Sequence, residues 1–191
     1  MLDETRNNFL CSVCYEEGGL GLCFGDISTG DLTADQVLAQ DMETLLHILE
    51  DRLARYSPSE ILLNPQALSF SGLADFIRDK LHAAVECQDQ ALYDDLEGSQ
   101  QAVCRQFGGK SLAQLELSDK PLAVKALGAL FDYLSRTQIT GLERMNEVDI
   151  GADAGVMGLD INARRNLELT ETLRNKEKKG SLLWVLDRTK T

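Results

Sequence analysis

The sequence lacks any apolar run close to the roughly 20 residues that span a bilayer, and it does not begin with the charged-then-apolar order of a secretion signal. Basic residues are also scarce, because 19 Lys or Arg face 31 Asp or Glu and leave a formal net charge of −12. This charge repels phosphate backbones and anionic lipids, which argues against stand-alone binding to nucleic acids or membranes. We therefore expect a soluble, cytoplasmic protein without membrane contacts.

Cysteine and histidine are also few. The five cysteines are an odd number in a chain of 191 residues, long enough to fold without disulfides, so reduced thiols are expected. Cys11 and Cys14 have the C-x-x-C spacing of zinc and redox sites, but a second pair is missing, and on a strand their sulfurs would point to opposite faces. His47 and His82 have no nucleophile or carboxylate at a recognisable spacing, so we expect neither to act as a catalytic base.

A β-meander, a helix and a buried strand are predicted at the start of the chain. Apolar and small residues alternate at period two in the first segments. Asp41 is the expected N-cap of the helix, and Ser57-Pro58 ends it. The continuous apolar run 61–63 is typical of a strand buried on both faces. The strands are expected at 8–15, 20–28, 32–34 and 60–63, and the helix at 42–56.

Three more helices and one short strand are predicted further along. Gly108-Gly109 is a natural stop for the second of these helices, and Pro121 is tolerated in the first turn of the third. The alternation of helices and strands ends there, so we expect an α/β domain over 1–117 and a mainly α-helical segment over 118–191. The helices are expected at 72–81, 92–107 and 119–138, and the strand at 85–87.

One segment is similar to a nucleotide-binding loop. Gly108-Gly109-Lys110-Ser111 matches the end of G-x-x-x-x-G-K-[ST], but Cys104 occupies the position of the first glycine. The segment also follows a predicted helix, whereas the nucleotide loop follows a strand. We therefore expect no nucleotide to bind here.

The acidic residues raise the possibility of a nuclease. A meander followed by a helix and a strand is the order of a ribonuclease-H-like sheet, whose nucleases bind two magnesium ions through carboxylates. Asp26 and Asp31 are the candidates, but the buried run 61–63 has no acidic residue to complete a cluster. Hydrogen bonding of Asp26 to the turn 28–30 is the favoured interpretation.

The end of the chain has the opposite charge. Residues 164–191 hold eight Lys or Arg against four Asp or Glu, a balance of +4. Such a segment could contact phosphate, or it could be a solvated helical face that flanks the apolar run 182–186.

Six segments spread along the chain point to one family. The first three are Asn7-Asn8-Phe9-Leu10, Gly25-Asp26-Ile27-Ser28-Thr29-Gly30-Asp31 and Ser57-Pro58-Ser59-Glu60-Ile61-Leu62-Leu63. They resemble the connector domain of the bacterial MutS mismatch-repair proteins. Three later segments resemble the run that opens the MutS core domain: Leu159-Asp160, 163–169 and 180–191. The resemblance covers essentially the whole chain in the correct order.

The resemblance implies a ribonuclease-H-like connector domain without catalytic activity over 1–117, followed by the start of the helical core. Such a connector joins the mismatch-reading domain to the core and helps to form the surface that binds MutL. The Phe-x-Glu mismatch reader and the Walker ATPase are missing, so the chain is expected to be a middle fragment that needs no cofactor. The parent is expected to be a homodimer that binds ATP, magnesium and mismatched duplex DNA.

The resemblance also suggests partner sites. Gln100 and Gln101 lie outside the apolar stripe of the expected helix 92–107 and are the candidates for MutL contact. The candidates for phosphate contact in the parent are Arg164, Arg165, Lys178 and Lys179. No catalytic, cofactor or metal residue is assigned. Three alternatives stay open: a magnesium-dependent ribonuclease-H-like nuclease using Asp26, a free-standing adaptor, and autonomous DNA binding through the basic tail, to which Arg174 and Lys176 would also contribute.

Overall fold

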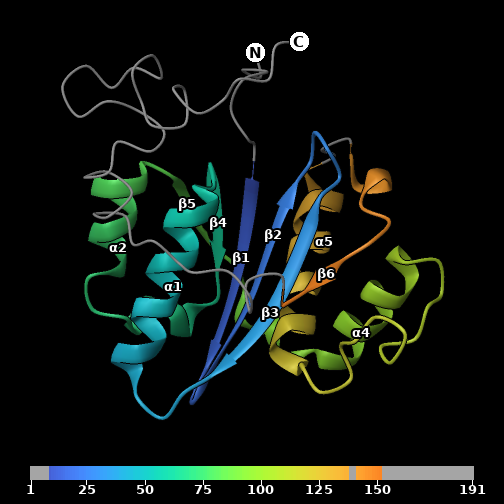
Figure 1. Cartoon of the computed structure of the whole chain (residues 1–191), viewed down its shortest axis with the longest axis horizontal. Helices are drawn as coiled ribbons and strands as arrows, with labels where there is room; N and C mark the ends of the chain where they lie inside the picture. The colour runs from blue at the N-terminus through green and yellow to red at the C-terminus, as the bar shows by residue number, and fades with distance from the viewer. Residues whose placement is uncertain (1–8, 138–140, 152–191) are drawn as a thin grey trace, which may run out of the picture. The chain divides into compact units, whose positions relative to one another are not determined.

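A computed structural model describes residues 9–137 and 141–151. The chain divides into two compact units, Met1–Gly155 and Val156–Thr191, and all described residues belong to the first. This unit is a six-stranded mixed sheet with helices on both faces (Figure 1). Within the described ranges, no helix combines the length and the apolar composition needed to cross a membrane.

The sheet is built around a long hairpin. Its strands lie in the order β5-β4-β1-β2-β3-β6, where β2 is antiparallel to β1 and β3, and the pairs β1–β4, β4–β5 and β3–β6 are parallel. The strands are β1 Phe9–Glu16, β2 Gly19–Asp26, β3 Leu32–Leu38, β4 Glu60–Leu63, β5 Ala84–Cys87 and β6 Asp149–Ile150. The predicted meander, buried strand and short strand are confirmed, whereas β6 was not anticipated.

The helices form two layers, with α1 and α2 on one face of the sheet and α4 and α5 on the other (Figure 1). Their bounds are α1 Met42–Tyr56, α2 Leu73–Phe76, which continues as a π-helical turn Ile77–Leu81, α3 Gln90–Asp94, α4 Leu96–Gln106 and α5 Pro121–Arg136. Two 3-10 turns, Pro65–Ser69 and Leu142–Arg144, complete the described elements.

Helix α1 has the ends that its sequence predicts. The Asp41 carboxylate accepts a hydrogen bond from the Thr44 backbone N–H at 2.7 Å, which satisfies one of the free donors of the first turn. Ser57 adopts a left-handed conformation and donates its N–H to the Leu53 carbonyl at 2.8 Å. Between these caps, the apolar stripe of the helix is buried against β1 and β2.

The two faces of β2 explain the two layers. Leu20, Leu22 and Phe24 point toward α1, and Phe24 stacks on Tyr56 with 4.1 Å between the ring centroids. The alternate positions, Gly19, Gly21, Cys23 and Gly25, are small and face α5. A Cβ atom at Gly21 would collide with the backbone of Leu122, so α5 lies directly on the strand. The glycines therefore set how closely the helix approaches the sheet.

The structure differs from two sequence expectations. The helix expected at 92–107 is two helices, because the chain breaks at Asp95, whose side chain caps α4 by accepting from the Gly98 N–H at 2.8 Å. The domain boundary expected after residue 117 does not coincide with the end of the packed unit. Helix α5 follows that point, yet eleven of its residues are buried against the sheet and α4. The helical segment expected at the end of the chain lies outside the described residues.

Candidate functional site

Asp26, the strongest nuclease candidate, has a structural role. Its side chain is buried, and Oδ1 accepts hydrogen bonds from the Ser28 N–H at 2.8 Å and the Ser28 hydroxyl at 2.5 Å. Asp31 accepts from the Thr29 hydroxyl at 2.8 Å in the same turn. The predicted hydrogen bonding of Asp26 to its turn is therefore confirmed.

The central strands do not assemble a metal site. The acidic residues of β1 and β4 are Glu16 and Glu60, where Glu16 pairs with Lys125 and Glu60 accepts from the Tyr133 hydroxyl at 2.6 Å. Throughout residues 9–137 and 141–151, no three His, Cys, Asp or Glu side chains lie close enough to hold a metal ion together. The described part of the chain therefore gives the magnesium-dependent nuclease no support.

The C-x-x-C pair is divided by the sheet, as its spacing predicts. Cys11 packs in the core beneath α1, and Cys14 packs in the core beneath α5. Burial raises the pKa of both thiols, that of Cys14 to about 12, because the thiolate cannot be hydrated there. These thiols are protonated and unreactive at neutral pH.

The other motifs also have local structural explanations. Gly108 and Gly109 both have positive φ angles and form the turn after α4, so the Gly-Gly-Lys-Ser segment follows a helix. His82 ends the π-helical turn with a φ of 54° and donates from Nδ1 to the Arg78 carbonyl at 2.8 Å. His47 is exposed on α1, 3.9 Å from Glu50.

Helix α4 carries the candidate partner residues. Its inner face is buried through Ser99 and Val103, and Ser99 lies so close to Gly128 of α5 that a Cβ there would approach the Ser99 Oγ to 2.6 Å. Gln101 is exposed and Gln100 is half-buried. The structure therefore places Gln101 on the outer surface of a helix that is fixed firmly to the fold.

Two buried or half-buried amides were missed by the sequence analysis. Asn64 is fully buried, accepts from the Tyr15 N–H at 2.9 Å and donates to the Tyr15 carbonyl at 2.7 Å, which clamps the end of β1 to the end of β4. Gln106, the last residue of α4, donates from Nε2 to the carbonyls of Leu142 at 2.7 Å and Met145 at 3.0 Å. The sequence signal for Gln106 was its position on the inner side of α4, three residues after the buried Val103.

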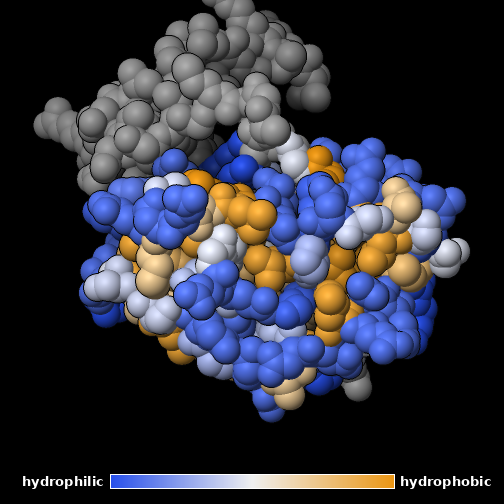
Figure 2. Space-filling view, turned by 90° about the horizontal axis from the view of Figure 1, so that it is seen from below, coloured by the Kyte–Doolittle hydropathy of each residue, from blue (hydrophilic) through white to orange (hydrophobic). Residues whose placement is uncertain are grey.

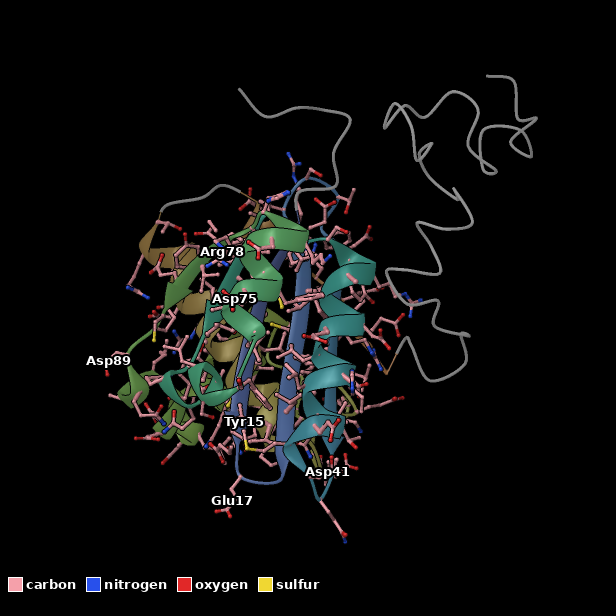
Figure 3. All side chains as sticks on the ribbon, turned by 90° about the vertical axis from the view of Figure 1, so that its left-hand side faces the viewer. Tyr15, Glu17, Asp41, Asp75, Arg78 and Asp89 are labelled. Carbon is pink, nitrogen blue, oxygen red and sulfur yellow. The ribbon has the colours of Figure 1, made fainter. Side chains whose placement is uncertain are left out.

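A groove on the α1/α2 face has a volume of about 320 Å³ and is mainly apolar. It is bounded by β4, β5 and α2, with Arg78 and His82 at its polar positions. Arg78 donates to Asp79 and Asp75, both at 2.7 Å, and these carboxylates raise its pKa, so it stays charged (Figure 3). Because that charge is already paired, the groove offers apolar contact rather than an anion site.

A second hollow of about 440 Å³ lies at the carboxyl end of β1, where Tyr15, Glu17 and Asp41 line it (Figure 3). Figure 2 views this end of the unit and shows apolar residues at the surface between hydrophilic ones. Met42 on its rim is 44% exposed and Leu38 nearby is 69% exposed. The phosphate-contact candidates Arg164, Arg165, Lys178 and Lys179 lie outside the described residues.

Comparison with known proteins places this arrangement in a family. The family model for MutS domain II matches residues 8–147. The chain is 40% identical over 190 residues to the DNA mismatch repair protein MutS of Caldanaerobacter subterraneus subsp. tengcongensis, and 38% identical over 190 residues to that of Lachnoclostridium phytofermentans. Each match covers 100% of this chain but only 21% and 20% of the relative, so the chain spans about a fifth of their length.

The matched range agrees with the packed unit, since it begins beside β1 and includes α5. It therefore contains α5, which the end of the α/β alternation in the sequence predicts to lie in a second domain. The chain belongs to the MutS family of DNA mismatch repair proteins and contains the family's domain II.

Proposed function

We propose that this chain is the connector module of a MutS protein. It joins a mismatch-binding domain to the core and ATPase domains, contributes to MutL docking and performs no catalysis itself. The parent protein acts in the cytoplasm as a homodimer on mismatched duplex DNA, and its ATP and magnesium are bound by a domain that does not belong to the described unit. Contacts of Arg164, Arg165, Lys178 and Lys179 with DNA phosphate are part of the same proposal.

We also propose that the fold is ribonuclease-H-like. The meander, the helix α1 and the parallel strand β4 follow in the order expected for such a sheet.

The observation that carries the connector role is the path of the chain through one sheet. Strand β1, the first strand along the described chain, lies at the centre of the sheet, and β6, the last, lies at its edge. A single row of paired residues crosses between them, from Cys11 to Phe24, Thr33 and Asp149. Three strand spacings of about 4.8 Å separate the two ends of this row. A displacement of β1 or of β6 is therefore transmitted to the other strand through hydrogen-bonded strands and two packed cores rather than through a flexible loop.

The outer face of α4 is the surface that we assign to MutL. The helix is anchored to α5 by close packing, so a partner bound to Gln101 would act on the whole unit. The charge of the chain favours a protein partner here, because a net charge of −12 disfavours DNA. Coupling between sites requires such a unit, whose position both ligands can bias.

The test is a titration of this chain with the N-terminal domain of the matching MutL, followed by light scattering. We expect Gln101→Lys to weaken binding at least tenfold, because it places a charge in the centre of the contact. Gln40→Lys is the matched control, since Gln40 is equally an exposed glutamine but belongs to the rim of the hollow beside α1. Equal affinities of the two variants would remove α4 from the docking surface.

The same variants are then tested in the full-length parent with mismatched DNA and ATP. Binding by the isolated chain means that the docking surface is complete on the connector. Binding by the loaded parent alone, with the same sensitivity to Gln101→Lys, means that α4 contributes to a surface that other domains complete.

A further inference from the structure

Gln106 connects two parts of the chain that are far apart in sequence. Its Nε2 atom donates one hydrogen bond to the Leu142 carbonyl at 2.7 Å and one to the Met145 carbonyl at 3.0 Å. A primary amide has two N–H donors on one nitrogen, and here both are used on one segment. The contact joins the last residue of α4 to the segment that leads into β6.

This segment is tightly fitted to the turn after β2. Met145 is fully buried, and a Cβ at Gly25 would approach its methyl group to 2.9 Å. Arg144 donates from Nη1 to the Ser28 carbonyl at 3.1 Å, and Gly30 leaves just enough room for the Arg144 backbone. The segment thus has one well-defined seat, with the turn on one side and Gln106 on the other.

Beyond the seat, the chain continues along the edge of the sheet. Strand β6 pairs with β3 over only two residues, and the Gly151 N–H donates to the Ala34 carbonyl at 3.1 Å. Two paired residues give a short ladder, so the position of β6 depends on the seat at 142–145. Gln106 supplies the side-chain hydrogen bonds that link this seat to α4.

We propose that Gln106 is a positioning residue that locks the segment 141–151 to helix α4, so that a protein bound on the outer face of α4 is coupled to strand β6. The coupling to a partner rests on the proposed function, but the lock itself does not. By linkage, if the bound partner stabilises the seated form of the segment 141–151 by some factor, seating that segment raises the affinity for the partner by the same factor.

Hydrogen exchange of this chain tests the lock. A net hydrogen bond changes an opening equilibrium by about fivefold, so losing both should raise exchange by about 25-fold. We expect this rise at the amides of Met145 and Gly151 in Gln106→Met, which keeps the length of the side chain but removes its donors. Gln106→Lys restores hydrogen-bond donors at the end of this side chain and should return exchange to within about fivefold of that in the unmutated chain. Gln101→Met, on the outer face of the same helix, should leave both amides unchanged.

The amides of β1 and β4 serve as an internal reference for the stability of the whole unit. The lock is overturned if the amides of Met145 and Gly151 exchange at the same rate in Gln106→Met as in the unmutated chain. It is equally overturned if all amides accelerate together, because Gln106 would then contribute to general stability alone.

Hydrogen exchange with MutL added separates the lock from the docking proposal. The N-terminal domain of MutL should slow exchange of the Gly151 amide in the unmutated chain and not in Gln106→Met. If MutL binds in the titration but leaves exchange at Gly151 unchanged in the unmutated chain, the coupling fails while the docking proposal and the lock stand. If MutL does not bind, the docking proposal and the coupling both fail and only the lock stands. If MutL protects Gly151 equally in both proteins, coupling through Gln106 is excluded.

Discussion

Replacing Gly21 by Ala should lift the start of α5 from the sheet. The added Cβ would collide with the Leu122 carbonyl group and lie 2.7 Å from the Ala123 nitrogen. These are backbone atoms, so no side-chain rotation relieves the collision and the helix itself must move. Overpacking usually costs 1–3 kcal/mol, and a collision with backbone belongs at the upper end, so we expect a loss of about 3 kcal/mol in the free energy of unfolding.

Urea unfolding followed by far-UV circular dichroism measures this loss, and for a unit of this size it corresponds to a decrease in Tm of about 9 °C. Gly19→Ala is the matched control on the same face of β2. Its Cβ would meet Leu122 Cδ1 at 2.7 Å and Leu38 Cδ2 at 2.8 Å, which are ends of flexible side chains. We expect that variant to lose less than about 1.5 kcal/mol. Equal losses, or a loss under about 1 kcal/mol for Gly21→Ala, would show that α5 does not rest on the strand as described.

Three further predictions concern buried groups. At pH 8 a thiol reagent should modify Cys87 and Cys104 rapidly, and should reach the buried Cys11, Cys14 and Cys23 only after unfolding, because burial raises their thiol pKa; a third rapid thiol would contradict this. Asn64→Ala leaves the buried N–H and carbonyl of Tyr15 without their partner and should cost about 3 kcal/mol in urea unfolding, against no more than about 0.5 kcal/mol if water replaces the amide. Asp26→Ala removes the acceptor of its turn and should cost about 2 kcal/mol by the same measurement, and an unchanged unfolding midpoint would refute the structural role.

The elements that the sequence predicted well have local signals. The hairpin follows from alternation at period two, and α1 follows from an N-cap, an apolar stripe and Ser57-Pro58 at its end. Strand β4 follows from three consecutive apolar residues between a turn and Asn64. In each case the residues that decide the conformation are neighbours in the chain, so no knowledge of the fold was needed.

The parts that sequence reasoning missed depend on distant residues. Asp95 interrupts a helical pattern because it caps the next helix, and the apolar spacing on both sides conceals the break. Strand β6 has two residues, too few for any periodicity, and forms because β3 offers an edge. The π-helical turn Ile77–Leu81 likewise has no distinctive composition.

The assignment of α5 to a second domain rested on the end of the α/β alternation, which is a weak criterion. A stronger signal was present on β2, where Gly19, Gly21, Cys23 and Gly25 alternate with large apolar residues. A strand with one face of small residues needs a helix backbone close to that face. Helix α5 is apolar on most of its circumference, which is typical of a helix buried between layers rather than of one at the surface of a new domain.

The candidate partner site also has a part that local periodicity predicts and a part that depends on distant residues. Periodicity placed Gln101 on the outer face of its helix, because a single helix decides which residues point away from its own apolar stripe. It could place Gln106 on the inner side of the helix, but it could not identify the acceptors, which lie 36 and 39 residues further along the chain. An exposed glutamine is only one surface residue among many, whereas Gln106 ties this helix to the segment that contains β6. The coupling proposal therefore rests on a contact between distant segments, and the exchange rate of Gly151 is the quantity that measures it.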